Sequence, residues 1–259
     1  MSAMTRHDSW PAGVPCWTDL MVPDPAAVKP FYEAVLGWVF TEPDDTYGGY
    51  VMAMRDGAPV AGLGPLLPGS RTGWTMYFAS DDIVASAAAI GSAGGALVRD
   101  PDSVGPLGRM LIATDPTGAV FGVWQAGTFA GSAIANEAGA LVWEDLRSSD
   151  PDAARTFYGS VFGFDFAGVD MASADYTTFA LSGEEEARGG IGGMMDAEGV
   201  GSHWLVYFGV DEMDAALAAA TAAGGAAPIP PFDTPYGSMA GLTDPAGVSF
   251  WVVELAAAQ

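Results

Sequence analysis

Trp17-Thr18-Asp19-Leu20 is the stretch that decides the fold, because it returns later in the chain as Trp143-Glu144-Asp145-Leu146. The second copy begins 126 residues after the first (143 minus 17). Further pairs follow in the same order: Asp24-Pro25 and Asp150-Pro151, Phe31-Tyr32 and Phe157-Tyr158, Gly94-Gly95 and Gly224-Gly225, Asp115-Pro116 and Asp244-Pro245. Their offset stays between 126 and 130 residues. A match that keeps its order along the chain indicates the tandem duplication of one domain.

Each half is predicted to contain the same elements. The first strand covers residues 15–22, and Asp24 then supplies an N-cap followed by a proline at the first helical position. The helix ends at Gly37, and short strands with glycine-rich turns come after it. The pattern restarts with a strand at 74–79 and a helix at 82–91. The chain is therefore expected to hold four βαβββ units.

This order of elements predicts an α+β fold with two domains, residues 14–125 and 140–255. A stretch of small and polar residues at 126–139 is the expected linker. Gly189-Gly190-Ile191-Gly192-Gly193 is similar to a phosphate-binding loop, but it lacks the Lys-Ser/Thr pair of a P-loop and does not open a helix. We interpret this run as a flexible turn that precedes a strand.

The composition limits the classes of partner. The chain has 32 acidic and 9 basic residues, a formal net charge of −23, and a single lysine, Lys29. Nucleic-acid binding needs a basic surface, so we expect no nucleic-acid partner. The apolar runs are too short for a membrane span, residues 1–11 hold no signal peptide, and the single Cys16 excludes an intramolecular disulfide. We expect a cytoplasmic protein, monomeric or homodimeric, without a membrane partner.

The Asp-Pro and Phe-Tyr pairs of each first helix, with Asp-Pro-x-Gly before each last strand, resemble the vicinal oxygen chelate superfamily. Its members include glyoxalase I, bleomycin-resistance proteins, fosfomycin-resistance enzymes and extradiol dioxygenases. The tandem form, with Trp-x-Asp-Leu opening each half, is similar to actinobacterial proteins described as a 27 kDa antigen or a hydroxylase. The resemblance implies that the four units form two open barrels, each around a pocket.

Metal-dependent members of that superfamily carry His, Gln or Glu at three positions in each site. The resemblance maps these positions, half by half, onto Trp17, Thr75 and Gly122, and onto Trp143, Leu205 and Trp251. None of these side chains binds a divalent metal as the family does, except threonine weakly. His203 lies near one position and His7 lies outside the fold. We therefore expect no metal and no other cofactor.

Residues two apart on a strand share a face, so Trp17 and Asp19 should both point into the first barrel, as should their copies in the second. A carboxyl group in an apolar cavity has a raised pKa, which suits a general acid or base. The alternative is that both aspartates only bind backbone amides. The candidate catalytic residues are Asp145, His203 and Asp19. The candidate substrate-binding residues are aromatic: Trp143, Tyr207, Tyr236, Trp251, Trp17 and Tyr77.

Three functions follow from these residues. The first is metal-independent acid–base chemistry, such as isomerisation, cyclisation or elimination, on a small apolar or aromatic metabolite. The second is binding and sequestration of an antibiotic or metabolite without turnover, as bleomycin-resistance proteins do. The third is a scaffold with no small-molecule role, which a shallow or filled pocket would favour.

Overall fold

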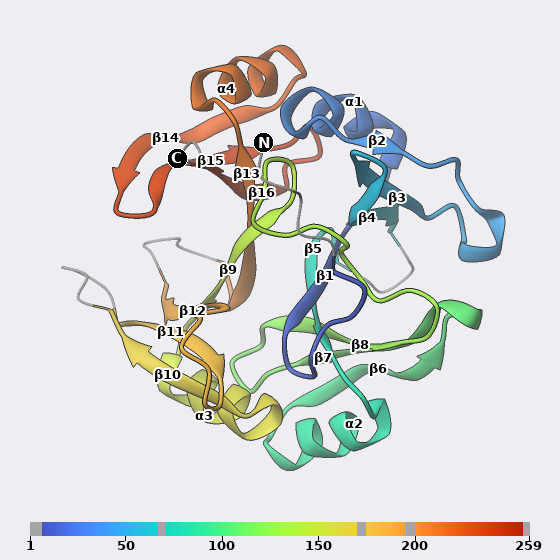
Figure 1. Cartoon of the computed structure of the whole chain (residues 1–259), viewed down its shortest axis with the longest axis vertical. Helices are drawn as coiled ribbons and strands as arrows, with labels where there is room; N and C mark the ends of the chain where they lie inside the picture. The colour runs from blue at the N-terminus through green and yellow to red at the C-terminus, as the bar shows by residue number, and fades with distance from the viewer. Residues whose placement is uncertain (1–6, 67–70, 170–174, 195–199, 256–259) are drawn as a thin grey trace.

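The computed structural model describes residues 7–66, 71–169, 175–194 and 200–255, and it contains one eight-stranded mixed sheet in each half (Figure 1). The strands of the first half are β1 (Pro15–Val22), β2 (Val39–Phe40), β3 (Val51–Arg55), β4 (Ala58–Pro65), β5 (Gly73–Ala79), β6 (Ala96–Ser103), β7 (Gly108–Thr114) and β8 (Val120–Ala126). Those of the second half are β9 (Leu141–Ser148), β10 (Phe164–Gly168), β11 (Tyr176–Leu181), β12 (Gly189–Gly193), β13 (His203–Val210), β14 (Ala226–Thr234), β15 (Gly237–Thr243) and β16 (Ser249–Glu254).

Each unit carries one α-helix between its first two strands. The helices are α1 (Pro25–Leu36), α2 (Ile83–Ser92), α3 (Pro151–Phe162) and α4 (Met213–Ala222), and the short 3-10 turns are η1 (Asp45–Tyr47) and η2 (Gly105–Leu107). The four βαβββ units predicted from the repeat are confirmed. Among the described residues, no helix is both long and apolar enough to cross a membrane.

The two units of each half pair with one another. The strand orders are β2-β3-β4-β1-β5-β8-β7-β6 and β10-β11-β12-β9-β13-β16-β15-β14. The antiparallel pairs β1–β5 and β9–β13 join the units. Neither sheet closes on itself, so the expected tandem of two open barrels is confirmed.

The predicted caps explain where the first helix of each half begins and ends. Asp24 Oδ1 accepts a hydrogen bond from the Ala26 amide at 3.0 Å, and a proline takes the first helical position. Gly37 ends α1 in the left-handed region with φ of 65°, which glycine adopts without strain. Asp150 and Gly163 do the same for α3.

One apolar core extends through both halves. The helices pack across the duplication, α1 beside α4 and α2 beside α3, as the upper and lower edges of Figure 1 show. The Phe31 ring of α1 meets the Phe250 ring of β16 at 5.9 Å between centroids. In the opposite direction, Phe157 of α3 meets Phe121 of β8 at 5.8 Å. These four rings thus belong to a single core that crosses the duplication.

The segment between the sheets is bound to both of them. Its Ser132 amide donates to the Cys16 carbonyl at 2.7 Å, and its Gly139 amide donates to the Gly209 carbonyl at 2.8 Å. These bonds satisfy backbone groups that a free linker would leave to water. The connection between the halves is therefore a packed part of the fold.

The glycine run at 189–193 is strand β12, so its interpretation as a turn is wrong. β12 lies parallel to β9, with Gly190 beside Asp145. A Cβ atom at Gly190 would overlap the Tyr176 hydroxyl, and one at Gly189 would lie 2.6 Å from the Phe179 ring. Glycine is used here because large side chains approach the backbone closely, which is a recognised role of glycine in strands.

Candidate functional site

The strand pairs at the middle of each sheet place Trp17 and Asp19 on the face turned away from the helices, the helix-free face. Alternate residues of β1 point to opposite sides, and Leu20 packs into the core against the helices. Strand β5 lies beside β1 with Tyr77 opposite Trp17. Three of the predicted site residues of the first half therefore meet on one surface.

The carboxyl group of Asp19 is buried among tyrosines, with 4% of the residue exposed. The hydroxyl of Tyr77 donates to Asp19 Oδ2 at 3.0 Å, and that of Tyr50 donates to the same oxygen at 3.3 Å. Trp17 Nε1 in turn donates to the Tyr50 hydroxyl at 3.0 Å. Asp19 Oδ1 is buried and has no hydrogen-bond partner.

Burial raises the pKa of Asp19 to about 7, against the pKa-lowering hydrogen bonds from Tyr77 and Tyr50. The pKa values of both tyrosines are raised well above their ordinary range, first by burial and then by the charge of Asp19. The hydroxyls therefore remain protonated donors. The carboxyl group, in contrast, can exchange its proton near neutral pH.

Two glycines make the space for this cluster. A Cβ atom at Gly62, which lies beside Asp19 on β4, would overlap the Tyr50 hydroxyl. A Cβ atom at Gly122, beside Tyr77 on β8, would overlap the Tyr77 ring. Each tyrosine reaches the carboxyl group only because the neighbouring strand has no side chain there.

The second half repeats the cluster around Asp145, which has 3% exposure. Trp143 Nε1 and the Tyr176 hydroxyl donate to Asp145 Oδ1 at 2.9 and 2.6 Å. The Tyr207 hydroxyl donates to Oδ2 at 2.8 Å, and Arg147 Nη2 donates to the same oxygen at 2.6 Å. Both carboxylate oxygens are therefore fully engaged, and a buried cation balances the charge.

Three further residues of the second half were predicted at the site, and they differ in whether they contact the Asp145 cluster. Trp251 stacks on Tyr207 with 5.6 Å between ring centroids. His203 stands opposite Arg147 in the sheet, and its Nδ1 lies 2.8 Å from the Gly201 carbonyl. Tyr236 lies on the turn between β14 and β15 with 69% exposure. The structure thus brings Trp143, Tyr207 and Trp251 to Asp145, and it gives His203 and Tyr236 no described contact with the carboxylate.

The positions where the superfamily carries metal ligands do not fit a metal in either half. The Trp17 indole donates to Tyr50, and the space beside Gly122 is filled by the Tyr77 ring. In the second half the third position is the Trp251 indole, which is stacked on Tyr207. Within the described ranges, no three His, Cys, Asp or Glu side chains lie close enough together to hold a metal ion.

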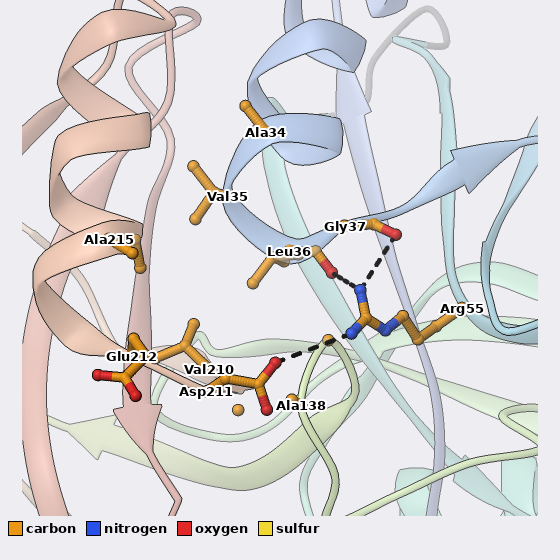
Figure 2. Close-up of a pocket in the computed structure, with 13 residues that line it drawn as sticks. Ala34, Val35, Leu36, Gly37, Arg55, Ala138, Val210, Asp211, Glu212 and Ala215 are labelled. Carbon is orange, nitrogen blue, oxygen red and sulfur yellow. Dashed lines mark hydrogen bonds and ion pairs between the residues drawn. The ribbon is translucent and has the colours of Figure 1, made fainter.

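Two pockets stand out among the described residues, and neither is lined by Asp19 or Asp145. A pocket of about 230 Å³ opens where the end of α1 faces the start of α4, shown in Figure 2. Arg55 is its cation: Nη1 lies 3.4 Å from the carbonyls of Leu36 and Gly37, and Nη2 lies 3.9 Å from Asp211. A second pocket, of about 210 Å³, lies between the N-terminal segment and β9.

Three members of the clusters were missed by sequence reasoning. Tyr50 and Tyr176 are 126 residues apart, the same offset as the Trp-x-Asp-Leu copies, so the repeat itself could have identified them. The sequence pointed less clearly to Arg147 as a member of the cluster. Its counterpart at the same offset is Met21, and a charged residue opposite an apolar one in a repeat suggests a local change of environment.

Comparisons with known proteins agree with this architecture. The family model of the Glyoxalase/Bleomycin resistance protein/Dioxygenase superfamily matches residues 16–123 and 140–252. "Putative glyoxylase CFP32" of Mycobacterium tuberculosis is 37% identical over 265 residues, which cover 99% of this chain and 100% of that protein. "Anthracycline biosynthesis protein DnrV" of Streptomyces peucetius is 35% identical over 259 residues, 94% of each chain.

Solved structures share the fold at low sequence identity. The Mn(II)-bound glyoxalase from Novosphingobium aromaticivorans has a TM-score of 0.67 and 17% identity, covering 94% of this chain and 82% of that one. The 2,3-dioxygenase LapB from Pseudomonas sp. KL28 has a TM-score of 0.65 and 19% identity, covering 97% and 93%. With both halves matched by the family model, the chain belongs to the Glyoxalase/Bleomycin resistance protein/Dioxygenase superfamily.

Proposed function

We propose that the protein performs metal-independent acid–base chemistry on a small aromatic metabolite, with Asp19 as the proton carrier. The observation that carries this proposal is the state of the Asp19 carboxyl group. It is buried, its pKa is raised to about 7, and one of its oxygens has no partner. A general acid or base works best when its pKa is near the working pH.

The two carboxyl oxygens of Asp19 have different roles. Tyr50 and Tyr77 donate to Oδ2 and stabilise the ionised form, while Oδ1 is left to accept a proton from the substrate. In an isomerisation, the proton passes from a substrate carbon to Oδ1 and returns to a different substrate atom. The carboxyl group then ends in its starting state, so no other reactant is needed.

An aromatic substrate suits the surroundings of Asp19. Partly exposed apolar side chains pack against the buried cluster that holds Trp17 and Tyr77: Trp10, Met52, Val104, Leu107, Met110, Ile112 and Phe129. Flat aromatic molecules bury much area against such side chains. The anthracycline biosynthesis relatives support this class, since anthracyclines are polycyclic aromatic compounds.

The second half is assigned a supporting role. Asp145 accepts four hydrogen bonds, one of them from Arg147, and so offers no open position to a substrate proton. His203 remains a candidate proton carrier only if a substrate bridges it to this cluster. Sequestration without turnover is the alternative function, favoured by the close packing of the Asp19 carboxyl group.

Deuterium exchange tests the proposal without knowledge of the final product. The protein is incubated in D₂O with hydroxylated anthraquinones that carry a ketone side chain, and exchange at the carbon next to the ketone is followed by NMR. Wild type should accelerate exchange, and Asp19→Asn should lower the rate about 100- to 10,000-fold. Asp145→Asn, if folded, should keep most of the rate. Binding of these compounds without exchange would favour sequestration.

A chelator experiment tests the metal-independence separately. Because the side chains at the ligand positions are indoles, a glycine and other poor ligands, EDTA treatment should leave the exchange rate unchanged. Loss of activity with EDTA, restored by added Mn²⁺ or Zn²⁺, would contradict this part of the proposal while leaving the role of Asp19 open to the mutant test.

A further inference from the structure

The pocket of about 210 Å³ between the N-terminal segment and the second sheet contains a buried carboxyl group that the proposed chemistry does not use. It is lined by Trp10, Val14, Pro15, Ala135, Asn136, Leu141, Val142, Trp143, Glu144, Glu186, Ala187 and Arg188. These residues come from both halves and from the segment that joins them. The apolar majority and two indoles give it the character of a small-molecule pocket.

Glu144 is the unusual member of this lining. It lies between Trp143 and Asp145 on β9, points to the opposite side of the sheet, and is 4% exposed. No hydrogen bond or ion pair of its carboxyl group is found in the described structure, and the residue lines the pocket. A buried carboxyl group without a partner is costly, and a ligand that pairs with it would recover that cost.

We propose that this pocket binds a small organic cation, a primary ammonium group on an apolar or aromatic body, with Glu144 as its counter-ion. The ammonium donates to the Glu144 carboxylate, and the apolar body lies against Trp10 and Val14 of the lining. Ammonium groups also interact favourably with indole faces.

The charges around Glu144 favour a cation over an anion. Arg188 is the one cation of the lining, and its Nη2 is already paired with Glu184 at 2.9 Å and with Glu186 at 3.2 Å. Asp145 adds a negative charge from the other face of β9. Because Glu186 is paired with Arg188, the Glu144 carboxylate is the lining charge that a bound anion would meet without an ion-pair partner.

The pocket also predicts a pH signature. Burial raises the pKa of Glu144 well above its usual range, the charge of Asp145 raises it further, and Arg188 acts against both. Cation binding must therefore release the Glu144 proton, and the affinity should rise with pH while the ligand amine stays protonated.

The test compares benzylammonium with its neutral analogue, benzyl alcohol, by isothermal titration calorimetry. Wild type should bind benzylammonium at least about tenfold more tightly. Calorimetry in two buffers of different ionisation enthalpy should show proton release on binding, and the affinity should increase from pH 6 to pH 8. Equal affinities for the two probes, or an affinity that falls with pH, would overturn the proposal.

Two variants and one control locate the site. Glu144→Thr installs the residue that the first half has at the equivalent position, Thr18, and Glu144→Gln keeps the size of the side chain. Both should lose the preference for benzylammonium. Glu212→Gln removes an exposed acid from the other pocket and should change nothing. Retained preference in a folded Glu144 variant refutes the proposal. If both variants unfold, proton release by wild type decides it.

Discussion

Asp19 and Asp145 hold equivalent places in the two sheets, and each lies among one tryptophan and two tyrosines. They differ in charge balance. Arg147 pairs with Asp145 at 2.6 Å, and the equivalent position of the first half is Met21. Asp145 has donors on both oxygens, whereas Asp19 has donors on one.

This difference shows how one duplicated cluster can carry two roles. A buried carboxylate needs either a cation or a proton to be tolerated in an apolar sheet. The second half uses a cation, which fixes the carboxylate. The first half uses a proton, which leaves the group free to titrate. The cation comes from one position on the shared strand, which is Met21 in the first half and Arg147 in the second.

The largest effect is expected from removing the cation. Arg147→Met gives the second cluster the residue of the first and leaves Asp145 buried without its counter-charge. We expect the free energy of unfolding at pH 8, measured by urea denaturation, to fall by about 3–5 kcal/mol. The loss should be smaller at pH 5, where a proton can replace the arginine. A loss of stability that is the same at pH 5 and pH 8 would contradict the idea that a proton can take the place of the arginine.

The proton of Asp19 should appear in the pH dependence of stability. A carboxyl group whose pKa is raised from 3.8 to about 7 binds more protons in the folded state than in the unfolded state between those values. Its stabilising effect is therefore present below pH 4 and is lost as the pH rises to 7, by at most about 4 kcal/mol. Asp19→Asn should flatten this part of the stability profile.

Two further variants sharpen that measurement. Met21→Arg places a cation where the second half has one, and it should also flatten the profile while the carboxyl group is kept. Asp211→Asn, at a side chain with 78% exposure, should leave the slope as in wild type. A slope that survives in Asp19→Asn would show that other acids cause it.

The glycines beside the two aspartates should not tolerate a larger side chain, and the loss of stability should be similar in the two halves. Gly62→Ala and Gly190→Ala each push a tyrosine hydroxyl away from its aspartate. Overpacking of this kind costs about 1–3 kcal/mol. We expect similar losses in thermal unfolding for both variants. Gly193→Ala, on the same strand as Gly190 but with open space around its Cβ position, is the matched control and should be much milder.

The smallest effect is the difference in stability between variants of two cluster tyrosines, one from each half. Tyr176→Phe removes a 2.6 Å hydrogen bond to an ion-paired carboxylate, and Tyr50→Phe removes one of 3.3 Å. Hydrogen bonds to charged groups contribute about 1.5–3 kcal/mol and neutral ones about 1 kcal/mol. At pH 6, Tyr176→Phe should therefore be the more destabilising of the two by urea denaturation. The reverse order would indicate that Asp19 is the more strongly charged group.

The repeat predicted the elements well because its signals are local. Asp24 and Gly37 act through their own backbone neighbours, so the ends of α1 could be read from the sequence. Strand alternation likewise predicted that Trp17 and Asp19 lie on one face, and the structure joins both to the Tyr50 hydroxyl.

The features that the sequence did not predict depend on contacts between distant parts of the chain. The run at 189–193 was misread because only the rings that approach it explain its glycines. Phe129 lies in the joining segment, yet its ring meets Trp17 at 4.9 Å. No local pattern predicts that a connecting segment covers part of the helix-free face.

The crossed packing of the helices has a consequence for how the protein folds. Tyr32 of α1 donates to Asp244 of the other half at 3.0 Å, and Phe31 and Phe157 are each buried against the opposite sheet. Either half made alone would leave these rings in water. The chain should therefore unfold in a single cooperative transition. A copy that gave up chemistry would still be kept by selection, because the other copy cannot fold without it.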